Sequence, residues 1–175
     1  KLGIALTETP SSRPEILIAG QHEKSLQWQG QPSTQHWVNS LVTQIRNVSD
    51  LPITFRPHPR ASYVVTSNLN NVKIELPKKI QNTYDSFNFD YNYHCIINYN
   101  SGPSVQSVLH GTPTICDISS LAFPVSNNLS DINNLVIPDR SNWLIELCHT
   151  EWTIPEIISG IPLLRLIPIL HAQLT

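Results

Sequence analysis

The sequence predicts an α/β protein built on a Rossmann-like parallel sheet with helices on both faces. First, short apolar runs alternate with amphipathic helical patterns along the 175 residues. Second, the connections between these runs are mostly short and contain many of the 14 prolines. Third, residues 94–116 have the pattern of a strand, a tight loop, a helix and a second strand. We therefore expect a doubly wound sheet with ligand-binding loops at the carboxyl ends of its strands.

Composition sets the class of protein. Hydrophobic residues make up 40% of the chain and charged residues 14%, which is typical of a folded globular protein. The net charge of −2 gives no overall attraction to nucleic acid. The three cysteines are widely spaced, so we expect neither a disulfide framework nor a zinc site. No apolar run approaches the roughly 18 residues of a membrane span, and we expect a cytoplasmic protein.

The domain organisation is predicted as a linker or arm at residues 1–14 followed by one domain at residues 15–175. The segment 9–14 is rich in proline and serine, which is typical of a linker. The chain starts at Lys1 and contains no methionine, so we expect it to be part of a longer protein, or a processed or trimmed one. The missing partner would be either an N-terminal acceptor domain or a separate chain.

The N-terminal half supplies the first predicted elements. Glu15–Gly20 is an apolar strand closed by glycine, and Pro52–Phe55 and Val72–Leu76 are two further strands. Ser33 is placed to cap a helix. The apolar face of that helix would comprise Trp37, Leu41, Val42 and Ile45. Residues 78–88 are ambiguous, and we expect one helical turn followed by a loop.

The C-terminal half starts with the unit at residues 94–116. Cys95–Tyr99 and Thr114–Cys116 are its strands, and either Asn100 or Ser101 caps the helix between them. Gly111 then ends that helix. Residues 135–137 are predicted as a last short strand. Helices follow at 140–149, at 151–159 with Thr150 or Thr153 as the cap, and at 162–174 with an interruption at Pro168.

Three predicted strand-end loops carry candidate binding residues. In the third loop, Asn100–Ser104, the first helical turn has free N–H groups and a partial positive charge, which suits a phosphate. The small residues Asn100, Ser101, Gly102 and Ser104 would leave room for the anion and add donors. The alternative is a strand–helix junction that binds nothing.

The second loop holds His58 between Pro57 and Pro59, which make its backbone rigid and extended. Arg56 and Arg60 flank this segment and have the bidentate donors that phosphate binding requires. The alternative is a basic surface turn whose prolines only end a strand.

The first loop, Gly20–Ser25, offers Gln21, Lys24 and Ser25 for a diphosphate or an acceptor. Ser120 is expected to reach the same edge from the neighbouring strand. A solvated loop is the alternative for Gly20–Ser25.

Several familiar motifs are absent from the sequence. It contains no Gly-x-Gly-x-x-Gly, no Walker loop and no Gly-x-Ser-x-Gly elbow. It also has no Asp-x-Asp pair and no histidine spacing suited to a metal. We therefore expect no cofactor and no metal ion.

The chain resembles the nucleotide-sugar half of GT-B glycosyltransferases, including those of tailed phages and bacterial polysaccharide clusters. It is also similar to the bacterial sialyl- and Kdo-transferases, which carry a His-Pro motif and a later serine motif. The similarity runs from about Ile16 to about Leu164. It rests on the ordered segments ILIAGQ, PITFRPHPR, YNSGPSVQSVLHGTP, SSLA and EWTIPEIISG, with Trp37 and the step from Arg140 to Trp143.

This resemblance implies a metal-independent transfer of a sugar from a nucleotide-sugar to an acceptor. It places nucleotide contact on His58 and phosphate binding on Ser101. A complete enzyme of this family has two Rossmann-like domains, and its usual catalytic base lies in the other one, so no catalytic residue is assigned here. The expected acceptor is a modified phage DNA base or a surface polysaccharide.

Two other functions remain open from the sequence. A non-catalytic nucleotide- or sugar-binding module would explain a chain with room for one domain only. A sugar-nucleotide epimerase shares the architecture but needs carboxylates facing the sugar. The predicted loops offer only Glu23 and Asp117 for that role.

Overall fold

The computed structural model describes residues 5–8, 13–61, 71–82, 87–150 and 152–174. The chain divides into two compact units, Lys1–Pro138 and Asp139–Thr175. Each unit is described by itself.

The first unit contains a parallel sheet with the strand order β3-β2-β1-β6-β7. Its strands are β1 (Ile16–Ala19), β2 (Ile53–Arg56), β3 (Val72–Ile74), β6 (Cys95–Ile97) and β7 (Thr114–Ile115). Ile16 of β1 is in register with Ile53 on one side and with Cys95 on the other. The chain thus extends the sheet first to one side of β1 and then to the other. This arrangement confirms the predicted Rossmann-like fold and places a switch point between β1 and β6.

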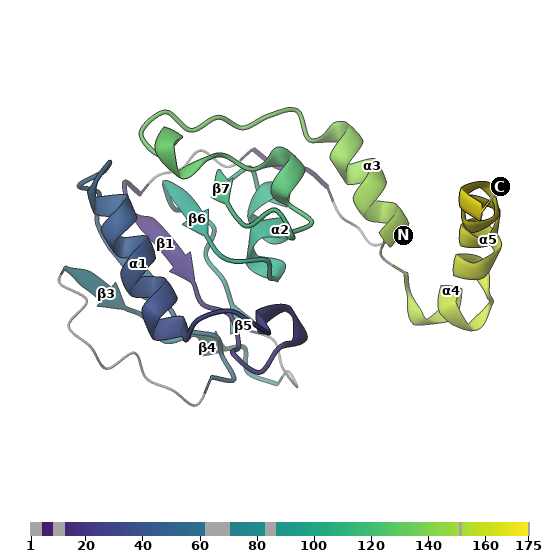
Figure 1. Ribbon diagram of the computed structural model, residues 1–175, viewed down its shortest axis with the longest axis horizontal. Helices are drawn as coiled ribbons and strands as arrows, with labels where there is room; N and C mark the ends of the chain where they lie inside the picture. Colours follow the sequence, from purple (N-terminus) through teal and green to yellow (C-terminus); the bar gives the residue numbers. More distant parts are fainter. Residues whose placement is uncertain (1–4, 9–12, 62–70, 83–86, 151, 175) are drawn as a thin grey trace. The chain divides into compact units, whose positions relative to one another are not determined.

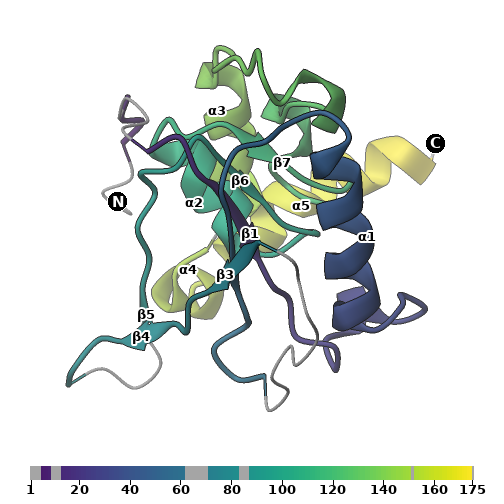
Figure 2. The ribbon, with the colours of Figure 1, turned by 90° about the vertical axis from the view of Figure 1, so that its left-hand side faces the viewer.

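Helices cover both faces of this sheet. Helix α1 (Thr34–Arg46) starts at Ser33, whose Oγ accepts a hydrogen bond of 3.3 Å from the backbone N–H of His36. Val38, Val42 and Ile45 bury its apolar face against the strands. Helix α2 (Gly102–Leu109) lies on the other side, so the strands stand between the two helices in Figure 2. Gly111 follows α2 with a φ of 76°, the left-handed conformation expected of a helix end.

An aromatic layer covers part of the face opposite α1. Tyr93 is fully buried with Leu17, Ala19 and Ile96, and Phe89 and Tyr91 pack against this cluster. The segment that leads into this layer forms a two-stranded antiparallel ribbon of β4 (Lys78–Lys79) and β5 (Phe87–Asn88). In Figure 1 the ribbon lies beyond the carboxyl ends of the strands. The segment was expected to contain one helical turn, but Lys78–Lys79 is instead paired with Phe87–Asn88 as two short antiparallel strands.

The predicted strand at residues 135–137 is wrong. The side chain of Asn127 takes the backbone bonds that a neighbouring strand would need. Its Nδ2 donates to the carbonyl of Val136 at 3.0 Å, and its Oδ1 accepts from the Val136 N–H at 2.9 Å. The surrounding chain forms short 3-10 helices instead, η2 (Phe123–Val125) and η3 (Leu129–Asp131), while η1 (Leu26–Trp28) precedes α1.

The second unit contains helices α3 (Ser141–Thr150), α4 (Ile154–Ile158) and α5 (Ile161–Leu174). Thr153 and not Thr150 caps α4, through a capping box with Glu156. The predicted interruption at Pro168 is wrong, since α5 includes this proline in its interior. Within the part of the chain that the structure describes, no helix combines the length and the apolar character needed to cross a membrane.

Candidate binding pocket at the strand ends

A pocket of about 270 Å³ lies where β1, β2 and β6 end. Gly20 lines it after β1, the segment 56–60 after β2, and the segment 101–103 at the start of α2. Pro77 and residues 87–89 of the ribbon complete the wall. The three loops predicted from the sequence therefore contribute in part to one site.

The first turn of α2 is held by the buried side chain of Asn98. Its Nδ2 donates to Ser101 Oγ at 2.9 Å, and its Oδ1 accepts a hydrogen bond from Ser104 Oγ. Ser101 is the N-cap residue in extended conformation, while Ser104 is completely buried. The hydroxyl of Ser104 thus supports the turn from inside. Gly102 faces open space, since a Cβ built on it meets no atom within 4 Å.

Arg56 is a buried cation in the wall of this pocket, with 6% of its surface exposed. Its Nη2 donates to Glu75 and to the hydroxyl of Tyr93, the latter at 3.2 Å. The guanidinium carbon lies 5.0 Å from the centre of the Phe89 ring. Its Nε and Nη1 are also buried, and neither has a hydrogen-bond partner among the residues that the structure describes. Two nitrogens of a buried guanidinium therefore lack partners among the described residues, which is costly in the absence of an anion or water.

The groups around Arg56 have shifted pKa values. Burial raises the pKa of Glu75, but hydrogen bonds from Arg56 and Lys73 outweigh it, so the pKa lies below its ordinary value. Burial raises the pKa of Tyr93, and the nearby Arg56 charge partly opposes this rise. Burial likewise raises the pKa of Tyr91 to about 12. Glu75 is therefore an anion and both tyrosines are neutral near pH 7.

His58 is oriented by the backbone that follows it. Its Nδ1 accepts a hydrogen bond of 3.1 Å from the N–H of Arg60. In the neutral ring the proton then lies on Nε2, which makes that atom a donor. The ring also meets His22 edge to face, with 5.3 Å between centroids and 88° between planes.

The loop after β1 serves mainly as a scaffold. The buried side chain of Gln21 donates to Asn100 Oδ1 at 2.8 Å and to Ser25 Oγ at 3.3 Å, and its Oε1 accepts from the Asn100 N–H. Asn100 in turn donates to Ser119 Oγ at 3.0 Å. These contacts join the first and third loops beside the pocket.

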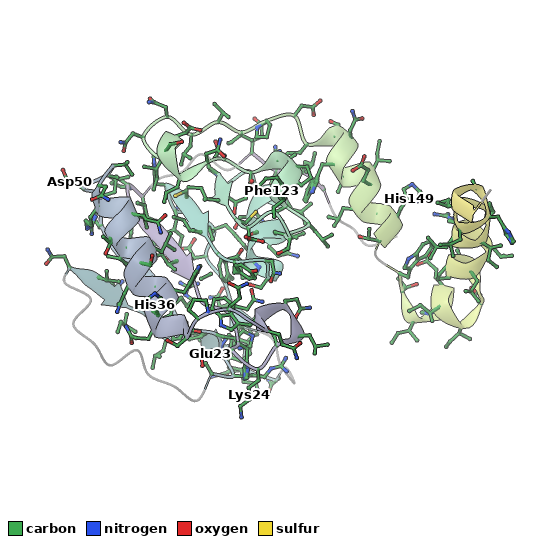
Figure 3. All side chains as sticks on the ribbon, in the orientation of Figure 1. Glu23, Lys24, His36, Asp50, Phe123 and His149 are labelled. Atoms are coloured by element: carbon green, nitrogen blue, oxygen red, sulfur yellow. The ribbon has the colours of Figure 1, made fainter. Side chains whose placement is uncertain are left out.

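Lys24 and Ser120 lie outside the lining of the pocket. Lys24 is exposed and extends outward from the loop ahead of α1, next to Glu23 (Figure 3). Ser120 is buried, and its Oγ accepts from the Ala122 N–H at 3.3 Å. The structure therefore brings five predicted residues together in the wall of the pocket, which are Arg56, His58, Arg60, Ser101 and Gly102. Gln21, Ser25 and Asn100 belong to its support.

Sequence reasoning missed an aromatic segment, of which Phe87 and Phe89 line the pocket and Tyr91 and Tyr93 pack in the cluster with Leu17 and Ile96. Phe87, Phe89, Tyr91 and Tyr93 alternate with polar residues over seven positions. This strict period of two is the pattern of a half-buried extended segment, and it was available in the sequence. His22 was also missed, because nothing local links it to His58.

The described lining of the pocket contains no Asp or Glu. Nor do the described residues contain a group of three or more side chains suited to a metal ion. Comparison with protein-family models, with curated proteins and with solved structures gives no match.

Proposed function

We propose that this chain binds the phosphate of a nucleotide-sugar in the strand-end pocket and is the donor half of a metal-independent glycosyltransferase. The observation that carries the proposal is Arg56, a buried guanidinium in the wall of a pocket that includes the start of α2. Two of its nitrogens, Nε and Nη1, have no hydrogen-bond partner among the residues that the structure describes. Phosphate oxygens suit such donors, because charge-assisted hydrogen bonds to guanidinium are strong and geometrically specific.

The charge of the pocket supports the same ligand. Arg56 and Arg60 are cations, His58 directs a donor, and no carboxylate in the described lining opposes an anion. The first turn of α2 adds backbone N–H groups and the positive end of a helix dipole. In a transfer reaction these groups would stabilise the negative charge of the leaving nucleotide, the task that a divalent metal performs in other enzymes.

A non-catalytic nucleotide-binding module is the second candidate, because the described lining holds no carboxylate to act as a base. The epimerase has less support. Glu23 accepts a hydrogen bond from the Thr34 N–H at the start of α1, and Asp117 accepts from the N–H and hydroxyl of Ser119. Both carboxylates therefore have structural partners.

Binding is tested by calorimetric titration with a panel of nucleoside diphosphates and CMP. Gly102→Glu should abolish binding by volume and charge without harming the fold, since its side chain starts in open space. Asn39→Glu, on the exposed side of α1, adds the same charge outside the pocket and should bind like the parent. Equal affinity of Gly102→Glu and parent would place the phosphate elsewhere. Magnesium or a chelator should change little.

His58→Ala should weaken nucleotide binding by about 1–3 kcal/mol, the range for losing a hydrogen bond to a charged group. Its melting temperature should stay close to that of the parent, because the ring is only partly buried. Unchanged affinity with a large fall in melting temperature would make His58 structural.

Nucleotide release from sugar nucleotides, followed by phosphorus NMR, separates the two candidates. A transferase donor half should slowly transfer the sugar to water or to an added acceptor, with the nucleotide released as the leaving group. Tight binding with no release would favour the non-catalytic module.

A further inference from the structure

We propose that His22 is a positioning residue for His58, holding its imidazole edge to face so that Nε2–H is presented as a hydrogen-bond donor. The contact joins the loops that follow two adjacent strands, β1 and β2. The part of this inference that concerns a ligand rests on the proposed function, whereas the part that concerns His58 does not.

The loop that carries His22 is fixed on both sides of the ring. Before it, Gln21 is buried and bound to Asn100. After it, Glu23 accepts the N–H of Thr34, and the His22 carbonyl accepts the N–H of Ser25 at 3.0 Å. Because the backbone of His22 has little freedom to move, the His22 ring can restrict the rotation of the His58 ring.

The two histidines share one local arrangement. Nδ1 of His22 accepts from the N–H of Lys24 at 3.0 Å, as Nδ1 of His58 accepts from the N–H of Arg60 at 3.1 Å. Each ring is thus bound by the backbone two residues later. In their neutral forms both rings carry the proton on Nε2.

The Nε2–H tautomer distinguishes a histidine pair that binds a metal ion from one that donates hydrogen bonds to an anion. A metal ion bound at Nε2 would require the proton on Nδ1, which would then face another N–H donor. A phosphoryl oxygen accepts from Nε2–H with no change in the ring. The pair is therefore suited to an anion, and His22 keeps His58 from rotating out of its bond with Arg60.

The inference is tested first without a ligand, by nitrogen-15 NMR of the imidazoles at about pH 8, with His58→Gln identifying the His58 signals. The parent should show His58 as one Nε2–H tautomer. His22→Ala should give mixed tautomers, and His22→Phe should restore the single form because it keeps a ring edge. His36→Ala, an exposed histidine on α1 (Figure 3), is the control and should change nothing.

Calorimetry with inorganic pyrophosphate then tests the consequence. His22→Ala should lower affinity about two- to tenfold, the range for losing one edge-to-face ring pair, and His22→Phe should recover most of it. If the parent binds no pyrophosphate or nucleotide, the proposed function fails while the NMR result still stands. A single His58 tautomer in His22→Ala, or zinc binding at Nε2 of both rings, would overturn the positioning role.

Discussion

At the scale of one residue, Arg56 is part of a buried network and is also the main group of the proposed binding site. Its Nη2 holds Glu75 and Tyr93, which follow β3 and precede β6, while Nε and Nη1 have no partner among the described residues. The sequence indicated a phosphate-binding arginine here from its place beside Pro57 and His58. It did not indicate the ion pair, because Glu75 is 19 positions away and meets Arg56 only through the pairing of β2 with β3.

Arg56→Met should lower the free energy of unfolding by about 1–3 kcal/mol, because among the described residues Glu75 keeps only Lys73 as a cationic partner and the hydroxyl of Tyr93 loses its donor. It should also remove anion binding. Glu75→Gln should also destabilise the protein, because the buried guanidinium of Arg56 loses its carboxylate partner. It should retain anion binding, since Nε and Nη1 are untouched. Urea denaturation and calorimetry measure both effects, and loss of binding in Glu75→Gln with normal stability would contradict this division of roles.

The cysteines should differ in reactivity. Burial raises the pKa of Cys95 to about 12 and also raises that of Cys116, whereas Cys148 is exposed. A thiolate-selective reagent at pH 8 should therefore modify Cys148 quickly, Cys116 slowly and Cys95 only after unfolding. Cys148→Ser should remove the fast phase, and a fast phase that survives in this variant would contradict the assignment.

At the scale of elements, the close packing of β1 against β2 leaves no room for a side chain at Gly20. A Cβ at Gly20 would lie 3.1 Å from the Phe55 ring and 3.2 Å from the carbonyl of Arg56. Phe55 is fully buried, so the ring has little room to yield. The glycine that closes the ILIAG run thus allows the first loop to pass directly over the second strand.

Gly20→Ala should destabilise the protein by about 1–3 kcal/mol through this overpacking. Gly102→Ala is the matched control and should have a much smaller effect, because its Cβ meets open space. Chemical denaturation of the two variants gives the comparison. Equal stability of both would mean that Phe55 repacks without cost.

The elements differed in how far their sequence determined them. Apolar runs and a capping serine were sufficient for β1, β2 and α1, since burial and local hydrogen bonds act within each segment. Residues 135–137 were predicted wrongly because the side chain of Asn127 satisfies their backbone. The pocket was predicted through its charged loops but not through its aromatic wall, whose position depends on how the ribbon meets the sheet.

For the first unit as a whole, the network around Arg56 links folding to pH. Glu75 joins the end of β3 to β2, and Tyr93 joins the same guanidinium to the segment before β6. Hydrogen bonds to one guanidinium therefore connect the end of β2, the end of β3 and the segment before β6. Protonation of Glu75 would remove its negative charge and weaken its hydrogen bond with Arg56.

The sign of this linkage follows from the pKa of Glu75. Burial raises this pKa, but hydrogen bonds from Arg56 and Lys73 lower it by more, so the folded pKa lies below the value in the unfolded chain. Its contribution to stability is complete above the unfolded pKa of about 4.3 and is lost as the pH falls through the lower folded value. Unfolding free energy should therefore fall more steeply below about pH 4.3 in the parent than in Glu75→Gln. With 29% of the carboxylate side chain exposed, solvent screening keeps the difference modest. Urea titrations between pH 7 and 3 measure it, and parallel curves for the two proteins would show that other carboxylates control acid unfolding.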